Sequence, residues 1–316
     1  MKIVILDKSA MGHDTPFSVL DDLGEVISYD QSSPEQVKER CSDADVIVLN
    51  KVKITREIMV SAKSLRLVCV FATGFDNIDL LAAKELGIAV CNVPGYSTES
   101  VALFTLSTVL SLITHMSEYS EYVRSGEYSA SSSPNKLTPI YHDLCGKTWG
   151  IIGYGNIGRA VGKVAETLGA RVIVNKRVPC EDAACVDIDT ICRESDIITV
   201  HCPLNDSTMG LINSERLAMM RPDVVLVNEA RGAVLDEEAV AKAVHEGKIG
   251  AFGCDVYSVE PFGTDHPYYA IRERKNVLLT PHAAWASYEA RAKCIGIIAE
   301  NIRSFSEGKM KNRVDI

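Results

Sequence analysis

Short apolar runs alternate with longer segments of helical pattern along the whole chain. In its first part, these runs predict buried strands at residues 3–6, 25–29, 46–49, 67–71 and 88–91. Intervening segments such as 34–40 and 80–86 carry apolar side chains at the spacing of one helix face. Because parallel neighbours need crossover connections, strands separated by helices predict a parallel sheet covered on both faces.

The pattern is interrupted after residue 91 and resumes as a second α/β region. A long apolar helix is predicted over residues 98–122, and residues 129–135 have the Ser, Pro and Asn content of a loop. Further buried strands are predicted at residues 149–152, 171–175, 196–200, 224–228, 249–255 and 276–280. A final helix over residues 288–305 places Ile295, Ile298 and Ile302 on one stripe, so we expect it to pack against the first sheet.

A glycine-rich sequence lies between the first strand of this second region and the helix that follows. It is Gly153-Tyr154-Gly155-Asn156-Ile157-Gly158, and the helix is predicted over residues 159–168. The first glycine permits a tight turn, the second lets the backbone approach a pyrophosphate, and the third lets helix and strand pack closely. The helix N-terminus attracts phosphates through its free N–H groups and its dipole.

These patterns predict an α/β chain with two doubly wound parallel-sheet domains. One is a Rossmann-type dinucleotide-binding domain over residues 98–286. The other is a flavodoxin-like substrate domain, discontinuous over residues 1–97 and 287–316, because the final helix returns to it.

Length and composition agree with this interpretation and exclude several classes of function. A chain of 316 residues exceeds the usual size of one domain, and a formal charge of −9 argues against a nucleic-acid partner. The ten cysteines form no C-x-x-C pair, so we expect no metal and a reducing, cytoplasmic compartment. The apolar run at residues 3–6 is too short for a signal peptide, and residues 101–113 are too few to span a membrane.

Polar side chains follow several predicted strands of the second region at their carboxyl ends, where parallel sheets bind ligands. They include His201, Arg231, Glu260 and His282. A guanidinium can hold the carboxylate of a 2-keto acid with two hydrogen bonds, and a histidine can donate a proton to its carbonyl near neutral pH. A neighbouring carboxylate would orient that histidine and raise its pKa. The combination indicates hydride chemistry on a 2-keto acid, with His201 as the rival base.

Together these features resemble the D-isomer-specific 2-hydroxyacid dehydrogenases over nearly the whole chain. The resemblance rests on the order and spacing of segments 72–79, 92–94, 153–158, 201–204, 228–232, 255–261 and 280–285. Within the family, Leu49-Asn50-Lys51, Ala72-Thr73-Gly74 and residues 281–285 are most similar to the glycerate dehydrogenase or hydroxypyruvate reductase branch. Glu260 stands where formate dehydrogenases of this superfamily carry a glutamine, which excludes that activity.

The resemblance implies a role for each candidate site residue. Arg231 would bind the substrate carboxylate and polarise the keto oxygen, His282 would be the general acid in reduction, and Glu260 would orient His282 and tune its pKa. Further substrate contacts would come from Asn50, Thr73, Gly74 and Trp285. The dinucleotide would contact Gly153, Gly155, Asn156, Ile157, Gly158, Lys176, Arg177, His201, Pro203, Thr208, Glu229, Ala230, Asp255, His282 and Ala284.

One position departs from the pattern of NAD-preferring members. These carry an acidic residue at the end of the second strand of the nucleotide domain, where it accepts hydrogen bonds from the ribose hydroxyls. Here the position is Lys176, followed by Arg177. Two cations suit a 2′-phosphate, so the sequence predicts NADP(H) in preference to NAD(H), unless both are solvated loop charges.

The resemblance favours hydroxypyruvate and D-glycerate as the substrate pair, with glyoxylate as a second substrate. Two alternatives stay open: a reductase of bulkier 2-keto acids, and a non-catalytic nicotinamide-sensing protein like the transcriptional corepressors of this fold. A complete set of Arg231, Glu260 and His282 counts against the second alternative. A homodimer with no membrane partner is also implied by the resemblance.

Overall fold

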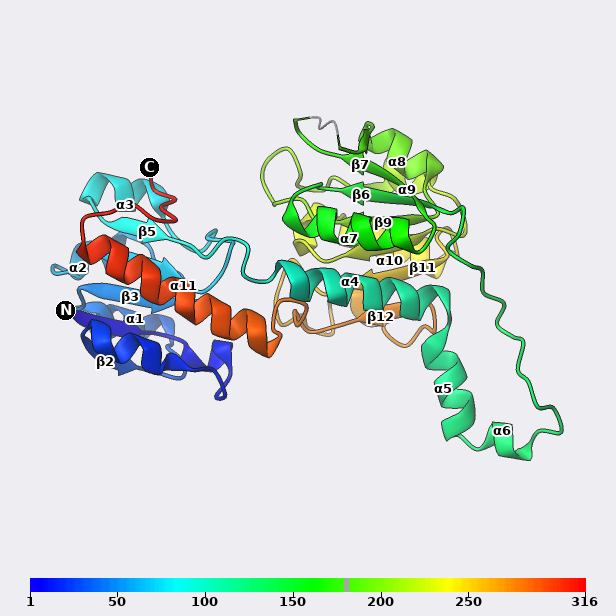
Figure 1. The fold of residues 1–316 in the computed structure, drawn as a ribbon, viewed down its shortest axis with the longest axis horizontal. Helices are drawn as coiled ribbons and strands as arrows, with labels where there is room; N and C mark the ends of the chain where they lie inside the picture. The colour runs from blue at the N-terminus through cyan, green and yellow to red at the C-terminus, as the bar shows by residue number, and fades with distance from the viewer. Residues whose placement is uncertain (179–181) are drawn as a thin grey trace. The chain divides into compact units, whose positions relative to one another are not determined.

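The computed structural model describes residues 1–178 and 182–316 of the chain (Figure 1). It contains two compact units. Unit 1 comprises Met1–Ser97 together with Ala286–Ile316, and unit 2 comprises Thr98–Trp285. Each unit has a parallel sheet of its own, so the predicted fold class of two doubly wound α/β domains is confirmed.

Unit 1 is built on a five-stranded sheet in the order β2-β1-β3-β4-β5, with every pair parallel. This is the flavodoxin-like order, in which the direction of winding reverses between β1 and β3. The central strands β3 and β4 are buried along their whole length, as a sheet covered on both faces requires. The strands are β1 (Lys2–Ile5), β2 (Glu25–Ser28), β3 (Val46–Leu49), β4 (Leu67–Val70) and β5 (Ala89–Cys91).

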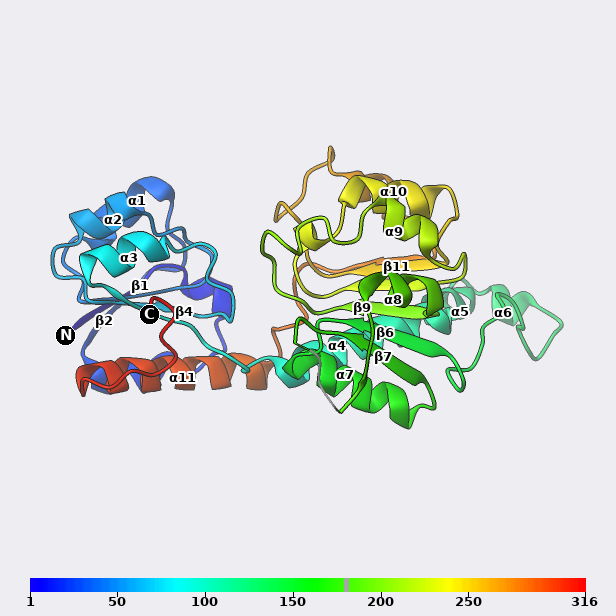
Figure 2. The ribbon, with the colours of Figure 1, turned by 90° about the horizontal axis from the view of Figure 1, so that it is seen from above.

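Figure 2 shows α1 (Pro34–Cys41), α2 (Arg56–Ser61) and α3 (Leu80–Leu86) on one face of this sheet and α11 (Tyr288–Ser306) on the other. The 3₁₀ helices η1 (Lys8–Met11) and η2 (Phe17–Leu23) follow β1, and α11 contacts η2 and β4. Its stripe of Ile295, Ile298 and Ile302 is fully buried, so α11 packs as the periodicity predicts.

Unit 2 is built on a seven-stranded parallel sheet in the order β12-β11-β10-β9-β6-β7-β8. The winding reverses between β6 and β9, which makes the end of β6 the switch point where such sheets bind ligands. The two-residue edge strand β8 was not predicted. The strands are β6 (Thr148–Ile152), β7 (Arg171–Asn175), β8 (Ala184–Cys185), β9 (Ile197–Val200), β10 (Val225–Asn228), β11 (Ala251–Cys254) and β12 (Val277–Leu279).

Helices cover both faces of this sheet. One face carries α4 (Thr98–Ile113) and α7 (Asn156–Thr167), which contact each other (Figure 2). The other carries α8 (Ile188–Glu194), α9 (Ser214–Met219) and α10 (Glu237–His245). Short 3₁₀ helices η3 (Gly232–Val234) and η4 (Pro267–Ala270) lie in the loops after β10 and β11.

The predicted single helix over residues 98–122 is wrong. The structure has α4, a break at Thr114 and His115, and then α5 (Met116–Arg124). The backbone of His115 takes a left-handed conformation with a φ of 52°, which a continuing α-helix cannot contain. A further helix, α6 (Glu127–Ala130), overlaps the predicted loop over 129–135.

Figure 1 shows α5 and α6, with the loop that leads back to β6, projecting from the body of unit 2 as an arm. Across residues 1–178 and 182–316, no single helix has the length and apolar character needed to cross a membrane. Among the described helices, α4 and α5 reach that length and composition only when taken together, and they are bent by 66° where they join.

Candidate functional site

The glycine turn after β6 has three glycines with different surroundings. Gly153 has a φ of +96°, and a Cβ there would lie 2.4 Å from the Cys202 nitrogen. A Cβ at Gly158 would lie 2.5 Å from the Gly153 carbonyl oxygen, so this glycine allows helix and strand to pack closely. At Gly155, no described atom outside the glycine and its two chain neighbours lies within 4 Å of the corresponding position.

Helix α7 begins at Asn156, three residues earlier than predicted, so Asn156, Ile157 and Gly158 form its first turn. No described side chain caps its first N–H groups, and Gly155 is the capping residue. A pyrophosphate needs space to approach the backbone and free N–H groups to bind. The open space beside Gly155 and the uncapped start of this 12-residue helix provide both. The residues present therefore fit the phosphates of a dinucleotide.

These surroundings predict opposite effects for two alanine substitutions. Gly153→Ala should lower the free energy of unfolding by about 3 kcal/mol, because it combines an unfavourable φ with a backbone clash. Gly155→Ala should change stability by less than about 1 kcal/mol yet weaken dinucleotide binding on the order of tenfold, because its methyl group occupies the phosphate approach. Chemical unfolding and fluorescence titration measure the two effects, and unchanged dinucleotide affinity in Gly155→Ala would contradict the assignment of the turn.

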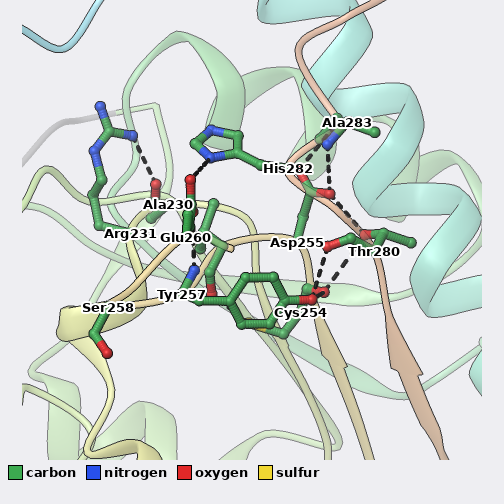
Figure 3. A network of polar contacts seen from close by, with 12 residues as sticks. Ala230, Arg231, Cys254, Asp255, Tyr257, Ser258, Glu260, Thr280, His282 and Ala283 are labelled. Atoms are coloured by element: carbon green, nitrogen blue, oxygen red, sulfur yellow. Dashed lines mark hydrogen bonds and ion pairs between the residues drawn. The ribbon is translucent and has the colours of Figure 1, made fainter. Parts of the chain in front are cut away.

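A histidine and a carboxylate meet beyond the ends of β11 and β12. His282 Nδ1 lies 2.7 Å from Glu260 Oε2, and the Tyr257 N–H donates to Glu260 Oε1 at 3.1 Å (Figure 3). A carboxylate only accepts hydrogen bonds, so His282 Nδ1 carries a hydrogen and Nε2, across the ring, is the nitrogen that can exchange a proton. Both side chains keep about a quarter of their surface exposed, 24% and 26% respectively.

The turn that carries His282 is held by Asp255, whose role the sequence did not indicate beyond a cofactor contact. Asp255 Oδ1 accepts from the Thr280 hydroxyl and the Ala283 N–H at 2.7 and 2.8 Å, and Oδ2 accepts from the Ala284 N–H at 2.8 Å (Figure 3). Such anchoring explains how His282 is kept at a φ of 53°, which is costly for a residue with a side chain.

Two further side chains that sequence reasoning missed also hold this turn. The Tyr257 hydroxyl donates to the Thr280 carbonyl at 2.8 Å, and the Ser100 hydroxyl, in the first turn of α4, donates to the Ala284 carbonyl at 2.6 Å. No local sequence signal marks either residue, because the contacts join segments far apart in the chain. Burial raises the pKa of the Tyr257 phenol, so that hydroxyl remains a donor.

Arg231 follows β10 in a loop that the Asn228 side chain holds in place. The Asn228 side chain donates to the Arg231 carbonyl and accepts from the Ala230 N–H, while Arg231 Nη1 donates to the Ala230 carbonyl at 2.8 Å. A Cβ at Gly232 would lie 2.1 Å from the Tyr257 carbonyl carbon, so this loop packs directly on the loop that leads to Glu260. The structure thus brings Arg231, Glu260 and His282 to one edge of the unit 2 sheet (Figure 3).

At the same edge, Glu229 is buried and His201 is half-buried, and both have buried polar atoms without partners in the described part of the chain. Among the described residues, Glu229 Oε2 and both ring nitrogens of His201 have no hydrogen-bond partner. Burial, with the Asp255 charge as a second cause, raises the pKa of Glu229 to about 9. Burial lowers the pKa of His201 to about 3, so it is neutral and a poor candidate for the general acid.

The remaining predicted dinucleotide contacts of unit 2 also lie beyond strand ends. The Thr208 hydroxyl donates to the Pro203 carbonyl at 2.7 Å and so shapes the loop after β9. Lys176 and Arg177 directly follow β7, the strand next to β6, and are half-buried and exposed respectively. Trp285, a predicted substrate contact rather than a dinucleotide contact, is half-buried at the end of unit 2.

Three predicted substrate residues belong to unit 1, beyond β3 and β4. Asp7, after β1, accepts from the backbone N–H groups of Asn50, Lys51 and Val52, which fixes the Asn50 loop at the switch point. The Thr73 hydroxyl donates to the Val93 carbonyl at 2.9 Å, and Gly74 follows it. These contacts leave the role of the three residues in substrate binding a prediction.

The comparisons with known proteins agree with this geometry. The family model of the D-isomer specific 2-hydroxyacid dehydrogenase, NAD binding domain, matches residues 106–284, which is more than half of the chain. The chain belongs to the D-isomer specific 2-hydroxyacid dehydrogenase family. That match includes the glycine turn, Arg231, Glu260 and His282, so unit 2 contains the NAD-binding domain of the family.

Relatives in this family match over the full length of the chain. A hydroxypyruvate reductase of Blautia hydrogenotrophica is 36% identical and covers 100% of both chains. A glycerate dehydrogenase of Methylorubrum extorquens is 33% identical and covers 99% of both.

Solved structures match with similar coverage. An acyclic imino acid reductase in complex with NADPH and D-Arg has a TM-score of 0.89 at 29% identity, covering 99% of this chain and 100% of that one. A D-lactate dehydrogenase from Aquifex aeolicus, complexed with NAD and lactic acid, has a TM-score of 0.89 at 27% identity, covering 100% and 99%.

Proposed function

We propose that this family member reduces small 2-keto acids to D-2-hydroxy acids, with hydroxypyruvate and D-glycerate as the main pair and glyoxylate as a second substrate. The observation that carries the proposal is the 2.7 Å contact between His282 Nδ1 and Glu260 Oε2, with Arg231 at the adjoining strand end. A proton donor, its orienting carboxylate and a guanidinium are the groups that reduction of a keto acid requires.

Each residue of this trio has one task in the proposal. Arg231 binds the substrate carboxylate through its planar fork and stabilises the negative charge that develops on the keto oxygen. Glu260 accepts the Nδ1 hydrogen of His282 and so leaves Nε2 to donate a proton to that oxygen. A reduced nicotinamide, when bound, supplies the hydride to the carbonyl carbon. In the reverse direction, His282 Nε2 takes the proton back as a general base.

The choice of substrate is supported by the relatives that match end to end. Hydroxypyruvate reductase and glycerate dehydrogenase are the names of two such proteins, and a glyoxylate reductase of Aeropyrum pernix is 36% identical over 89% of this chain. Bulkier 2-keto acids remain the second candidate, because the imino acid reductase of the same fold holds D-Arg. A non-catalytic sensor has less support, because the catalytic trio is complete.

Steady-state assays with three substrates test the proposal. Loss of reduced-nicotinamide absorbance is followed with hydroxypyruvate, glyoxylate and pyruvate, each with NADPH and with NADH. We expect hydroxypyruvate to have the highest kcat/KM. Dinucleotide binding without turnover of any of the three acids would contradict the proposed substrates.

We further infer a preference for NADP(H) over NAD(H). Lys176 and Arg177 follow the second strand of the nucleotide fold, where NAD-preferring relatives carry a carboxylate. Cations there can bind a 2′-phosphate, and neither can accept hydrogen bonds from ribose hydroxyls. NADPH in the imino acid reductase and NAD in the D-lactate dehydrogenase show that this fold accommodates both dinucleotides.

Charge reversal at Lys176 should change that preference. Lys176→Asp is expected to raise the Kd of NADPH about tenfold and to lower the Kd of NADH, because it removes a phosphate partner and adds a ribose acceptor. Lys163→Asp, an exposed charge reversal on α7, is the matched control. Fluorescence titration measures both constants, and an NADPH affinity that Lys176→Asp leaves unchanged would rule out the inference.

A homodimer is also part of the proposal. Six large apolar side chains of the projecting arm are exposed, which is the composition of a surface that a second subunit covers. They are Met116, Val123, Tyr128, Leu137, Ile140 and Tyr141.

A further inference from the structure

The carboxyl group of Glu229 is buried away from solvent. Glu229 follows β10, is only 8% exposed, and its Oε1 is 3.4 Å from the Thr108 hydroxyl of α4, which can donate to it. Its second oxygen, Oε2, is buried without a hydrogen-bond partner among the described residues. A charged carboxylate in such a place would be poorly solvated, so the position favours the neutral acid.

The carboxyl group next to Glu229, that of Asp255, already accepts hydrogen bonds on both of its oxygens. Asn228 pairs with Cys254 in the sheet, so Asp255 occupies the register position next to Glu229. Asp255 accepts three hydrogen bonds on its two oxygens, from Thr280, Ala283 and Ala284. Both oxygens of Asp255 are therefore occupied by donors, whereas Glu229 Oε2 has no partner among the described residues. The charge of Asp255 is a second cause, after burial, that raises the pKa of Glu229.

Among the described residues, no positive charge contributes to the raised pKa of Glu229. Val200 pairs with Asn228, which places His201 next to Glu229 on the β9 side. Burial keeps His201 neutral and raises the pKa of the Cys254 thiol on the β11 side, so neither group is charged near neutral pH. From α4, the uncharged hydroxyl of Thr108 lies within hydrogen-bond distance of Glu229.

We propose that Glu229 is a protonated acid in the wall of the nicotinamide site and releases its proton to solvent when an oxidised dinucleotide binds. The proposal rests on the proposed function, because it places the nicotinamide at this strand edge. An oxidised nicotinamide ring is cationic and a reduced ring is neutral. A nearby cation favours the charged form of a carboxyl group, whereas a neutral ring leaves Glu229 protonated.

Linkage then makes the choice between dinucleotides depend on pH. The cationic ring favours ionisation of Glu229. By linkage, ionised Glu229 increases the affinity for the oxidised dinucleotide by the same factor. Glu229 is protonated below its pKa of about 9 and ionised above it. The ratio of the Kd of NADP⁺ to that of NADPH should therefore fall on the order of tenfold between about pH 7 and about pH 10.

Two measurements test the proposal, with Glu229→Gln as the permanently neutral variant and Glu215→Gln, on the exposed start of α9, as the matched control. Infrared difference spectra of the protein without dinucleotide should show a protonated carboxylic acid near pH 7 that is lost only in Glu229→Gln. Fluorescence and calorimetric titrations should show proton release on NADP⁺ binding that is largest between about pH 8 and about pH 9, together with a pH-dependent Kd ratio. Both effects should be lost only in Glu229→Gln.

Three outcomes would overturn it. Absence of a Glu229-dependent carboxylic acid band near pH 7 would show that the residue is ionised. Binding of both dinucleotides with the same pH-dependent ratio in Glu229→Gln would refute this proposal alone. Failure of both dinucleotides to bind at any pH would refute the proposed function and this proposal with it.

Discussion

Replacing His282 with asparagine should lower kcat for hydroxypyruvate reduction by roughly 10²- to 10⁴-fold. The imidazole is the only group that the proposal gives to proton transfer, and its Nδ1 is held 2.7 Å from Glu260 Oε2. Asparagine can occupy the turn and hydrogen-bond to Glu260 but supplies no titrating proton. Since the glycine turn after β6, which holds the pyrophosphate in the proposal, is untouched, the Kd of NADPH should change by less than about threefold.

The same substitution at His142, an exposed residue before β6, is the matched control and should leave kcat unchanged. Glu260→Gln should give an intermediate loss of kcat, because an amide oxygen can still accept from Nδ1 but no longer stabilises an imidazolium. A kcat within about fivefold of the unmodified protein in His282→Asn would remove the residue from the chemistry.

Replacing Arg231 with glutamine should lower kcat/KM for hydroxypyruvate by about 10²- to 10³-fold. In the proposal, the guanidinium binds the substrate carboxylate and stabilises the charge that develops in the transition state. KM should therefore rise and kcat should fall. Arg231→Lys keeps the charge and loses the planar fork, and should therefore recover only part of the activity.

Arg124→Gln, at the exposed C-terminus of α5, is the control for the charge change. A glyoxylate KM unchanged in Arg231→Gln would contradict carboxylate binding, because glyoxylate presents little besides its carboxylate and carbonyl. Circular dichroism of each variant checks that the loop after β10, which Asn228 fixes, keeps its fold.

Most of the sheet architecture could be predicted because buried parallel strands have a simple signal. The central strands are short apolar runs, such as the Val, Ile and Leu of residues 46–49, and the helix between two such runs leaves few topologies. The pairing of His282 with Glu260 was predictable only from the resemblance to a family, because 21 residues separate them in the chain and no local pattern joins them.

The features that sequence reasoning missed depend on tertiary contacts. Asp255 resembles any acidic residue after a strand, yet it accepts hydrogen bonds from a turn 25 to 29 residues further along. The break at His115 is a backbone conformation that helix propensity does not reveal. The proposed proton on Glu229 depends on the burial of its side chain and on the hydrogen bonds that the neighbouring Asp255 already accepts. A sequence pattern shows neither.

The most direct measurement of the central claim is the identity and configuration of the product formed from hydroxypyruvate. NADPH consumption is followed optically, and the glycerate formed is quantified by chiral chromatography in the same reaction. We expect D-glycerate in equal amount to the NADPH consumed, and we expect both to be lost in His282→Asn. L-glycerate, or NADPH consumption that continues in His282→Asn at the original rate, would contradict the site described for Arg231, Glu260 and His282.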